Sequence, residues 1–314
     1  MSATVERRVR IGTSGWSYPK GEGTWNGIFY PAKVKNELEL YSRVFNTVEV
    51  NSTFYRLIDP RTARAWVEAT PEDFEFAIKV WQKFTHRRMF KKATGDEPVV
   101  TQQDYDDFKR GINPIAEECK LGCLLVQFSE WFSRTPENQE TLSSILSQFK
   151  EYPTAVELRH VSWGQDTSAT RQLLASYGAG WAFIDMPEFR ETIKQELEPQ
   201  KLVYVRFHGR NREKWRKHDA AEERYDYLYS KEELRPFAER IRELTGTGTA
   251  KVLVYFNNHA RAQAPANALM MAQQIGLAPK AVIREEFVRA FPGIREAAKE
   301  VQSADQRALD LKSP

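Results

Sequence analysis

The sequence predicts a single (β/α)8 barrel, an α/β fold of the TIM type, with a C-terminal helical extension. Eight short runs of apolar and β-branched residues recur along the chain, and most of them are separated by segments with helical spacing of apolar residues. Strands and helices that alternate in this way are typical of a parallel sheet covered by helices, and eight repeats within about 260 residues are typical of a closed barrel. We expect the barrel domain to span residues 1–275 and the extension to span residues 276–314.

The expected strands are short, rich in Val, Ile, Leu and aromatic residues, and bounded by polar or turn-forming residues. In chain order they are Val9–Ser14, Val48–Tyr55, Phe74–Trp81, Gly122–Phe128, Thr154–His160, Gly180–Asp185, Leu202–His208 and Val252–Asn258. The expected helices have apolar residues three or four positions apart. They are Glu37–Phe45, Arg61–Glu68, Gln139–Phe149, Ser168–Tyr177 and Glu232–Leu244. From about Ile283 the chain is polar with a helical stretch at Ile294–Val301, and we expect this part to lie outside the barrel.

A doubly wound open sheet is the alternative fold, because it shows the same alternation of strand and helix. Proteins of that fold that bind dinucleotides have a G-x-G-x-x-G turn after a strand. No expected strand of this chain leads into such a turn, so the pattern favours the barrel.

The composition indicates a globular protein. Of the 314 residues, 41% are hydrophobic and 28% are charged, which excludes disordered and low-complexity classes. Cys119 and Cys123 are too few for a disulfide framework, and no His pair stands at zinc spacing. The N-terminus has no apolar leader region, and no apolar run reaches the ~18 residues of a membrane span. We therefore expect a cytoplasmic protein that does not enter the membrane.

Polar residues occupy one face of most of the expected strands. Side chains alternate between the two faces of a strand, so the apolar set, which includes Val48, Ala182 and Val205, should face the outer helices. The opposite set should then face the interior near the carboxyl ends of the strands, where barrel enzymes have their active sites. This set consists of Glu49, Asn51, Lys79, Gln127, Glu157, Arg159, Asp185, Arg206 and His208, with Asn257 and Asn258 from the last strand and Ser14 and Trp16 from the first.

Two basic segments leave the ends of the third and seventh strands and should overhang the same mouth. Lys79–Lys92 has six basic residues and no acid, and Arg206–Lys217 has six basic residues and one acid, whereas the rest of the chain is net acidic. Such a concentration of charge favours an anionic ligand. We expect a phosphate group to be bound by Arg87, Arg88, Lys91, Lys92, Arg210, Arg212 and Arg216, with interleaved aromatic residues such as Tyr225 as stacking surfaces.

Seven segments of the chain resemble the YecE-like family, also grouped as domain of unknown function 72. They are IGTSGWSY at 11–18, FNTVEVNSTFYR at 45–56, FEFAIKVWQKFTH at 74–86, VELRHVSW at 156–163, YVRFHGR at 204–210, YDYLYS at 225–230 and VYFNNHARAQAPANA at 254–268. The resemblance implies a TIM-barrel-like fold without an established activity. It adds Tyr55 and His86 to the expected site and supports Trp16, Asn51, Tyr225, Asn257 and Asn258.

The expected site is compatible with three classes of function. A hydrolase or lyase acting on a phosphorylated or nucleic-acid substrate could use Glu49 and Glu157 as base and acid or as metal ligands, with His208 as proton shuttle. A sugar-phosphate isomerase or epimerase could use Glu157 as base and Lys79 to stabilise an enolate. A protein without catalytic activity could bind nucleic acid or a nucleotide at the same mouth. The sequence leaves these alternatives open.

No cofactor can be assigned from the sequence, and we expect no metal site. Lys79, Arg159 and Arg206 belong to the expected interior, and their charges would compete with a bound cation. The expected partner is an anionic small molecule or a nucleic acid. The sequence does not indicate the oligomeric state.

Overall fold

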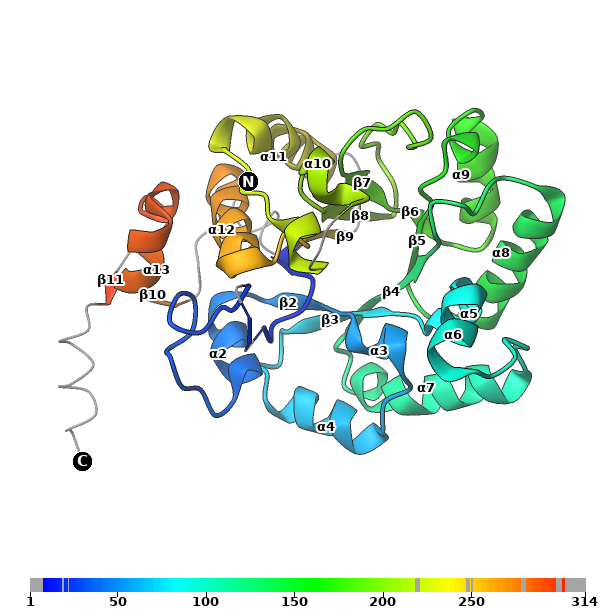
Figure 1. The fold of residues 1–314 in the computed structure, drawn as a ribbon, viewed down its shortest axis with the longest axis horizontal. Coiled ribbons are helices and arrows are strands. Elements are labelled where there is room, and N and C mark those ends of the chain that lie inside the picture. The colour runs from blue at the N-terminus through cyan, green and yellow to red at the C-terminus, as the bar shows by residue number, and fades with distance from the viewer. Residues whose placement is uncertain are drawn as a thin grey trace.

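The structure is a computed structural model, and it describes residues 8–18, 20–21, 23–217, 221–246, 249, 251–277, 281–297 and 301–302. Strands lie at the centre and helices surround them (Figure 1). The strands are β1 (Val9–Thr13), β2 (Thr47–Val50), β3 (Glu75–Lys79), β4 (Leu121–Gln127), β5 (Thr154–Glu157), β6 (Gly180–Trp181), β7 (Phe183–Asp185), β8 (Leu202–Phe207), β9 (Lys251–Phe256), β10 (Ile283–Arg284) and β11 (Val301–Gln302).

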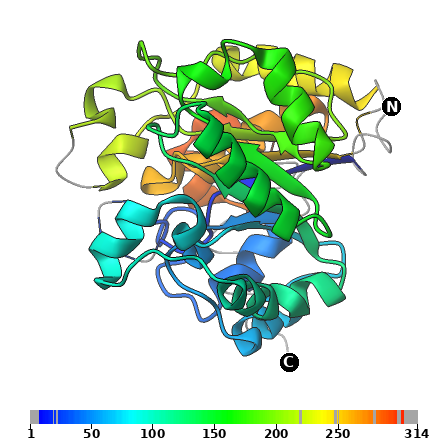
Figure 2. The ribbon, with the colours of Figure 1, turned by 90° about the vertical axis from the view of Figure 1, so that its right-hand side faces the viewer.

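Helices follow most of the strands. The α-helices are α2 (Glu37–Val44), α3 (Ser52–Tyr55), α4 (Pro60–Glu68), α5 (Gln82–Thr85), α6 (Arg87–Thr94), α7 (Gln102–Glu117), α8 (Pro136–Gln148), α9 (Thr167–Ser176), α10 (Arg212–Trp215), α11 (Lys231–Thr245), α12 (Gln263–Ile275) and α13 (Glu285–Ala290). The 3-10 helices are η1 (Val161–Trp163), η2 (Ala221–Tyr225), η3 (Ala260–Ala262) and η4 (Pro292–Ile294). In the turned view, the green helices α8 and α9 lie in front of the strands (Figure 2). Among the described residues, no helix has the length and apolar character that a membrane span requires.

The eight expected strands are present and are arranged in parallel sheets. One sheet has the order β2-β3-β4-β5-β6, and a second has the order β1-β9-β8-β7. All ladders within these sheets are parallel, with registers such as Glu49 opposite Ala77 and Val9 opposite Val252. The α/β class is therefore confirmed, whereas the hydrogen-bonded ladders form two sheets and not one closed sheet.

The two sheets approach each other closely at both of their borders. At the β1–β2 border, Ser14 forms an isolated parallel bridge with Glu49, and the Gly15 amide donates to the Glu49 carbonyl oxygen at 2.8 Å. At the other border, the expected strand Gly180–Asp185 is interrupted at Ala182. Its first part, β6, pairs with β5, and its second part, β7, pairs with β8 in the other sheet.

Glycines make these close approaches possible. A Cβ atom on Gly12 of β1 would lie 2.1 Å from the carbonyl oxygen of Thr47 in β2. A Cβ atom on Gly180 of β6 would lie 2.4 Å from the carbonyl oxygen of Leu202 in β8. Both distances are far below van der Waals contact, so any larger residue would force the sheets apart.

The core consists of a large cluster between strands and helices and a smaller one that joins the sheets. The smaller cluster contains residues of both sheets, namely Ala77, Cys123, Leu125, Ala155, Ala182, Leu202, Tyr204, Leu253 and Tyr255. In β8 the two faces separate as expected, since Val203, Val205 and Phe207 belong to the large cluster and Tyr204 to the small one.

The sequence predicted most strands and five helices correctly, but some elements differ. The expected strand end at Asn51–Tyr55 is helix α3, where the Thr53 hydroxyl donates to the Lys79 carbonyl oxygen at 2.7 Å. Helices α7 and α12 were not predicted, although α7 begins with a capping box formed by Thr101 and Asp104.

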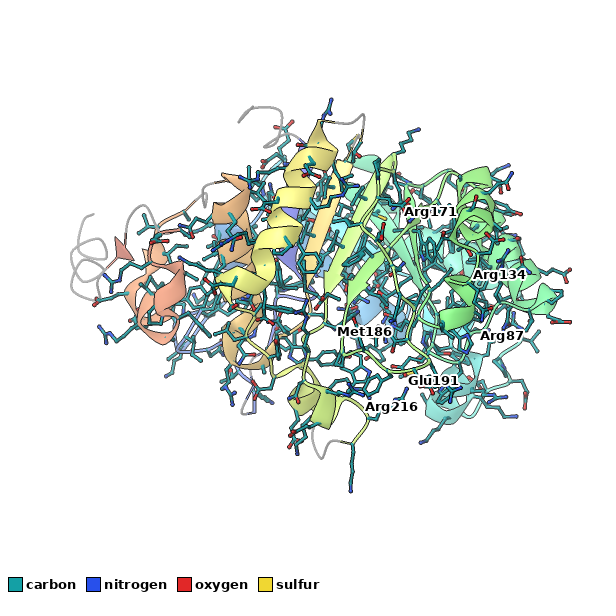
Figure 3. The ribbon with its side chains drawn as sticks, turned by 90° about the horizontal axis from the view of Figure 1, so that it is seen from above. Arg87, Arg134, Arg171, Met186, Glu191 and Arg216 are labelled. Carbon is teal, nitrogen blue, oxygen red and sulfur yellow. The ribbon has the colours of Figure 1, made fainter. Side chains whose placement is uncertain are left out.

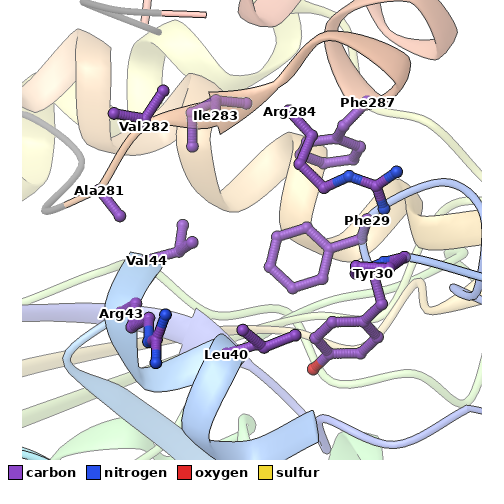
Figure 4. Close-up of a pocket in the computed structure, with 11 residues that line it drawn as sticks. Phe29, Tyr30, Leu40, Arg43, Val44, Ala281, Val282, Ile283, Arg284 and Phe287 are labelled. Atoms are coloured by element: carbon purple, nitrogen blue, oxygen red, sulfur yellow. The ribbon is translucent and has the colours of Figure 1, made fainter. Parts of the chain in front are cut away.

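The C-terminal segment packs beside α2 and α12 and includes α13, which was not predicted. An apolar pocket of about 270 Å³ separates Leu40 and Val44 of α2 from Ile283 and Phe287 of this segment (Figure 4). Within the predicted helical stretch Ile294–Val301, residues 298–300 lie outside the described part of the chain, as do residues 303–314 of the predicted extension.

We expect Gly12→Ala to destabilise the protein, because the added Cβ collides with backbone of the neighbouring sheet. Overpacking of this kind costs about 1–3 kcal/mol or more, and denaturant unfolding should measure it. Gly246→Ala is the matched control, since its Cβ would stand 3.3 Å from the nearest atom. Equal stability of the two variants would show that β1 and β2 do not approach as described.

Candidate functional site

A cavity of about 570 Å³ opens at the carboxyl ends of the strands and draws residues from both sheets. Its lining consists of Tyr18, Asn51, Ser52, Phe54, Tyr55, Lys79, His86, Met89, Gln127, Ser129, Glu130, Trp131, Arg159, Arg206, His208, Arg224, Tyr225, Asn257 and His259. These residues end or follow β1, β2, β3, β4, β5, β8 and β9. The parallel direction of the strands brings these ends to one edge.

Arg206 of β8 lies at the centre of the cavity floor and is almost completely buried. Its Nη2 donates to Glu49 Oε1 at 2.7 Å, and its Nη1 donates to Glu157 Oε2 at 2.6 Å and to Gln127 Oε1 at 3.0 Å. One guanidinium thereby joins β8 to β2, β4 and β5. Its planar set of donors suits two carboxylates at once.

Glu49 and Glu157 are fully buried behind Arg206, and all four of their carboxylate oxygens accept hydrogen bonds. Tyr204 donates to Glu49 Oε2 at 2.7 Å, and Arg159 Nε donates to Glu157 Oε1 at 2.6 Å. Neither carboxylate lines the cavity. This placement favours a role as counter-ions over the acid and base roles that the sequence suggested.

The pKa values of both carboxyl groups are lowered. Burial alone raises the pKa of Glu49, but the charge of Arg206 and hydrogen bonds from Tyr204 and Arg206 outweigh it. Burial likewise opposes ionisation of Glu157, and the charges of Arg159 and Arg206 hold its pKa well below the ordinary value. Both groups are therefore carboxylates at neutral pH.

His208 is buried beside this network and is neutral. Its Nε2 lies 3.3 Å from Arg159 Nη2, and its Nδ1 lies 3.0 Å from Asn257 Nδ2. Burial, followed by the charge of Arg206, lowers the pKa of His208 to about 4, although Glu157 acts in the opposite direction.

Lys79 ends β3 with its amine at the cavity wall. The Nζ atom lies 3.9 Å from the centre of the Phe54 ring. In the described part of the chain Nζ has no hydrogen bond or ion pair, and the side chain is 9% exposed. Burial and the charge of Arg206 lower the pKa of Lys79 to about 7, while Glu49 and Glu157 act in the opposite direction.

His86 lines the cavity on the loop after β3. Burial, then the charges of Lys79 and Arg159, lower the pKa of His86 to about 3, so its ring is also neutral. Its Nδ1 lies 2.9 Å from the Thr85 hydroxyl, and its ring meets the Phe54 ring edge to face.

The rim of the cavity includes residues that the sequence analysis missed. Trp131 is 79% exposed and Met89 is also exposed, so apolar surface faces solvent beside the polar floor. Arg224 lines the cavity with its guanidinium 5.4 Å from the Trp215 ring centre, and its buried Nε has no hydrogen-bond partner. Trp131 lies three residues after the end of a predicted strand, and this position could have predicted its place at the cavity rim.

Ten predicted residues line this cavity together: Asn51, Tyr55, Lys79, His86, Gln127, Arg159, Arg206, His208, Tyr225 and Asn257. Trp16 instead packs edge to face on Trp66. Asn258 donates to the carbonyl oxygen of Tyr227 and to Asn267, which makes it part of the scaffold.

Asp185 does not line this cavity, although the sequence analysis placed it in the barrel interior. Ala182, where the strand is interrupted, belongs to the small cluster between the sheets, while Phe183 packs against Phe237 of α11. Asp185 accepts from Arg210 at 2.7 Å and from Tyr229 at 2.6 Å. It lines a separate pocket of about 320 Å³ with Arg210 and Arg212.

The basic residues of the segment Arg206–Lys217 are largely paired with acids. Arg210 also reaches Glu233, and Lys214 pairs with Glu223 at 2.9 Å. Arg216 lies beside Glu191 (Figure 3), at 3.3 Å. Local ion pairs thus neutralise much of the charge that the sequence placed over the mouth.

Arg87 and Arg88 line a second cavity of about 480 Å³ that adjoins the first. The two cavities share His86, Met89, Ser129 and Trp131. Of the two lysines that follow, Lys91 pairs with Glu97 and Lys92 is exposed, and neither lines a cavity described above. The expected basic set is therefore divided among several places.

No group of three or more His, Cys, Asp or Glu side chains that could hold a metal ion occurs among the described residues.

The fold and cavity define an α/β protein of parallel sheets with a buried arginine–carboxylate network beneath a polar mouth. Residues 10–291 match the family described as "Protein of unknown function DUF72", and the chain belongs to this family. It is similar to UPF0759 protein YunF of Bacillus subtilis (strain 168), with 32% identity over 291 residues that cover 87% of this chain and 98% of the relative. It is also similar to UPF0759 protein YecE of Escherichia coli (strain K12), with 26% identity over 56% of this chain and 59% of the relative.

Solved structures of the same family are similar in fold. A DUF72 family protein (TM1631) from Thermotoga maritima MSB8 has 34% identity and a TM-score of 0.73, covering 86% of this chain and 99% of that chain. A DUF72 family protein (EF0366) from Enterococcus faecalis V583 has 27% identity and a TM-score of 0.73, covering 86% and 96%.

We expect Arg206→Met to lower the free energy of unfolding by about 3–5 kcal/mol at pH 7, because two buried carboxylates lose their shared cation. In the wild type these groups have lowered pKa values, so their contribution is present above the unfolded value of about 4.3 and is lost as the pH falls through the folded values. In the variant, Glu49 loses the charge that contributes most to lowering its pKa, whereas Glu157 keeps Arg159. Burial then favours the protonated form of Glu49, and the deficit should shrink between pH 7 and pH 4.

Arg216→Met is the control for this measurement, since Arg216 is half-exposed and pairs at the surface. It should change stability little at any of these pH values. A deficit for Arg206→Met that stays constant from pH 7 to pH 4 would contradict the assignment of Glu49 and Glu157 as its ionised partners.

Proposed function

We propose that the 570 Å³ cavity binds an anionic small molecule through a phosphate or similar group. The observation that supports this most directly is the arrangement of charge: Lys79, Arg159 and Arg206 line the cavity, whereas their counter-ions Glu49 and Glu157 lie behind them. Glu130, the acid in the lining, accepts from Trp215 Nε1 at 3.1 Å. A ligand at the floor therefore meets the three cations, and such an arrangement attracts anions.

Arg224 is the second support for an anionic ligand. The described residues provide no acidic partner for its guanidinium, which faces the cavity beside Tyr225. Arginine binds phosphate oxygens with two parallel donors. This residue is thus a better candidate for phosphate binding than Arg210 or Arg216, whose donors are occupied.

Within this proposal, conversion of the ligand would involve Lys79 and not the two glutamates. The carboxylate oxygens of Glu49 and Glu157 are fully used in hydrogen bonds, which disfavours a hydrolase that employs them as acid and base. Lys79 has a pKa near neutrality and an amine at the cavity wall. A reaction of the isomerase or lyase class fits this group better.

A nucleotide or single-stranded nucleic acid is the second candidate ligand. The exposed ring of Trp131 stands between the two adjoining cavities, and Arg87 and Arg88 line the outer one. Aromatic rings next to arginines are suited to stack bases and bind a phosphate backbone. A steep loss of affinity with salt would favour a polyanion, because log K falls by about 0.7 for each phosphate neutralised on a single strand.

We also propose that the two sheets act as one barrel around this cavity. The Ser14–Glu49 bridge and the division of Gly180–Asp185 between both sheets support this arrangement. The comparison of Gly12→Ala with Gly246→Ala tests its β1–β2 side.

A cytoplasmic location belongs to the same proposal. Both cysteines are free, and Cys119 is exposed, which suits a reducing compartment.

We expect Arg224→Gln to weaken sulfate and sugar-phosphate binding by about 1.5–3 kcal/mol, the value of a hydrogen bond to a charged group. Arg212→Gln is the matched control, because Arg212 also lies 5.4 Å from an aromatic ring but lines the pocket beside Asp185. Calorimetric titration of both variants should separate the two positions. Equal affinities would remove Arg224 from the binding site.

We expect sulfate affinity to fall as the pH rises above about 7, because the protonated amine of Lys79 binds an anion better than the neutral amine. Below this pKa the affinity should be constant. Sulfate is the probe because it does not titrate in this range, whereas phosphate does. Lys79→Met should bind more weakly. Because His259 also lines the cavity, the pH series is measured with His259→Gln added to both proteins. In that background Lys79→Met should show no pH dependence between pH 6 and 8, since His86 and His208 titrate at about 3 and 4. A wild type without this pH dependence would exclude Lys79 from anion binding.

A further inference from the structure

The amine of Lys79 differs from the other cationic groups of the cavity floor. The guanidinium groups of Arg159 and Arg206 donate to carboxylates, which fixes their positions. Lys79 Nζ instead lies over the face of the Phe54 ring. Its hydrogen-bonding capacity is unused among the described residues, and it borders a cavity large enough for a small metabolite.

Resting on the proposed function, we propose that Lys79 is a nucleophile that forms an imine with an anionic aldehyde or ketone in this cavity. A lysine next to other cations in a poorly solvated site is a known way to obtain a reactive amine at neutral pH. The geometry provides both conditions, since Arg206 and Arg159 line the same floor and the Lys79 side chain is mostly buried.

The step is a condensation without change of oxidation state. The lone pair of neutral Nζ attacks the carbonyl carbon, the C=O π electrons move to the oxygen, and one Nζ proton passes to that oxygen to give a carbinolamine. The C–O bond then breaks, the hydroxyl group leaves as water with the second Nζ proton, and the nitrogen lone pair forms the Nζ=C bond. The anionic group of the substrate is held by the cations that the proposed function assigns to binding.

Lys120 provides an internal control, because it is also buried and also has a lowered pKa. Its Nζ donates to the carbonyl oxygens of Val67 and Thr70 at 2.8 Å and to the Thr70 hydroxyl at 3.1 Å. It lines none of the cavities described above. Because a reagent cannot reach a buried amine that borders no cavity, Lys120 should be unreactive. Comparing Lys79 with Lys120 therefore tests whether reactivity depends on the cavity or on burial alone.

The experiment is reductive trapping on the full chain. The protein is incubated at pH 7 with D-glyceraldehyde 3-phosphate and cyanoborohydride, which delivers a hydride to the imine carbon and makes the adduct permanent. Peptide mass spectrometry then locates the modified lysines. At pH 7 the unprotonated fraction of an amine with a pKa of about 7 is roughly a thousandfold that of an ordinary lysine with a pKa of about 10.4.

We expect modification at Lys79 well before the exposed Lys91 and none at Lys120. The rate at Lys79 should rise with pH to a plateau above about 7. Sulfate should protect Lys79, D-glyceraldehyde should react more slowly than its phosphate, and Lys79→Met should lose the fast adduct while retaining its fold by circular dichroism.

Two contrary results are distinguishable. If sulfate binds by calorimetry but Lys79 reacts no faster than Lys91, the imine proposal is overturned and anion binding stands. If Lys79 reacts rapidly but equally with both sugars, and sulfate neither binds nor protects, the nucleophile stands and the proposed anion site is overturned.

Discussion

The ion network of Arg206 is the interaction on which the rest of the site depends. A single buried guanidinium on β8 contacts Glu49 from β2, Gln127 from β4 and Glu157 from β5. Strands β2, β4 and β5 belong to one sheet and β8 belongs to the other, so this side chain joins the two sheets. Buried charges are costly unless they are paired, so each partner requires the others to be in place. The network therefore couples the relative position of the sheets to the shape of the cavity floor.

The same network explains why the titratable groups above it are unusual. Its two cations, Arg159 and Arg206, face the cavity and raise the cost of any further positive charge there. Burial, together with these charges, lowers the pKa values of Lys79, His86 and His208. At neutral pH the two imidazoles are therefore neutral, and the Lys79 amine is divided between its protonated and neutral forms. An incoming anion would favour the protonated amine.

Patterns within single strands predicted the parallel α/β class and seven residues of the cavity lining, namely Asn51, Lys79, Gln127, Arg159, Arg206, His208 and Asn257. The family resemblance added Tyr55 and His86, and the basic segments added Tyr225. The strand patterns failed where partners distant in the sequence decide the outcome. Asp185 lies in a separate pocket beyond the point where the strand is interrupted at Ala182 and changes sheet, and no local signal marks that interruption. Likewise, Arg216 pairs with Glu191, which lies on another loop. The sequence did not show this pairing, so the charge of Arg216 was predicted to be available for binding a ligand. The start of helix α7 could have been predicted from the Thr101–Asp104 capping box, but the prediction relied on the spacing of apolar residues.

The pairing order of the strands has a consequence for biosynthesis. Strand β1 is made first, yet its ladder partner is β9, with Val9 opposite Val252. The five strands from β2 to β6 form their own sheet from one continuous stretch of chain. At a translation rate of roughly 5–20 residues per second, β1 waits on the order of 10–50 seconds on the ribosome before its partner has been synthesised. During that interval the β9-facing edge of β1 is unpaired, and an unpaired strand edge is open to pairing with other chains.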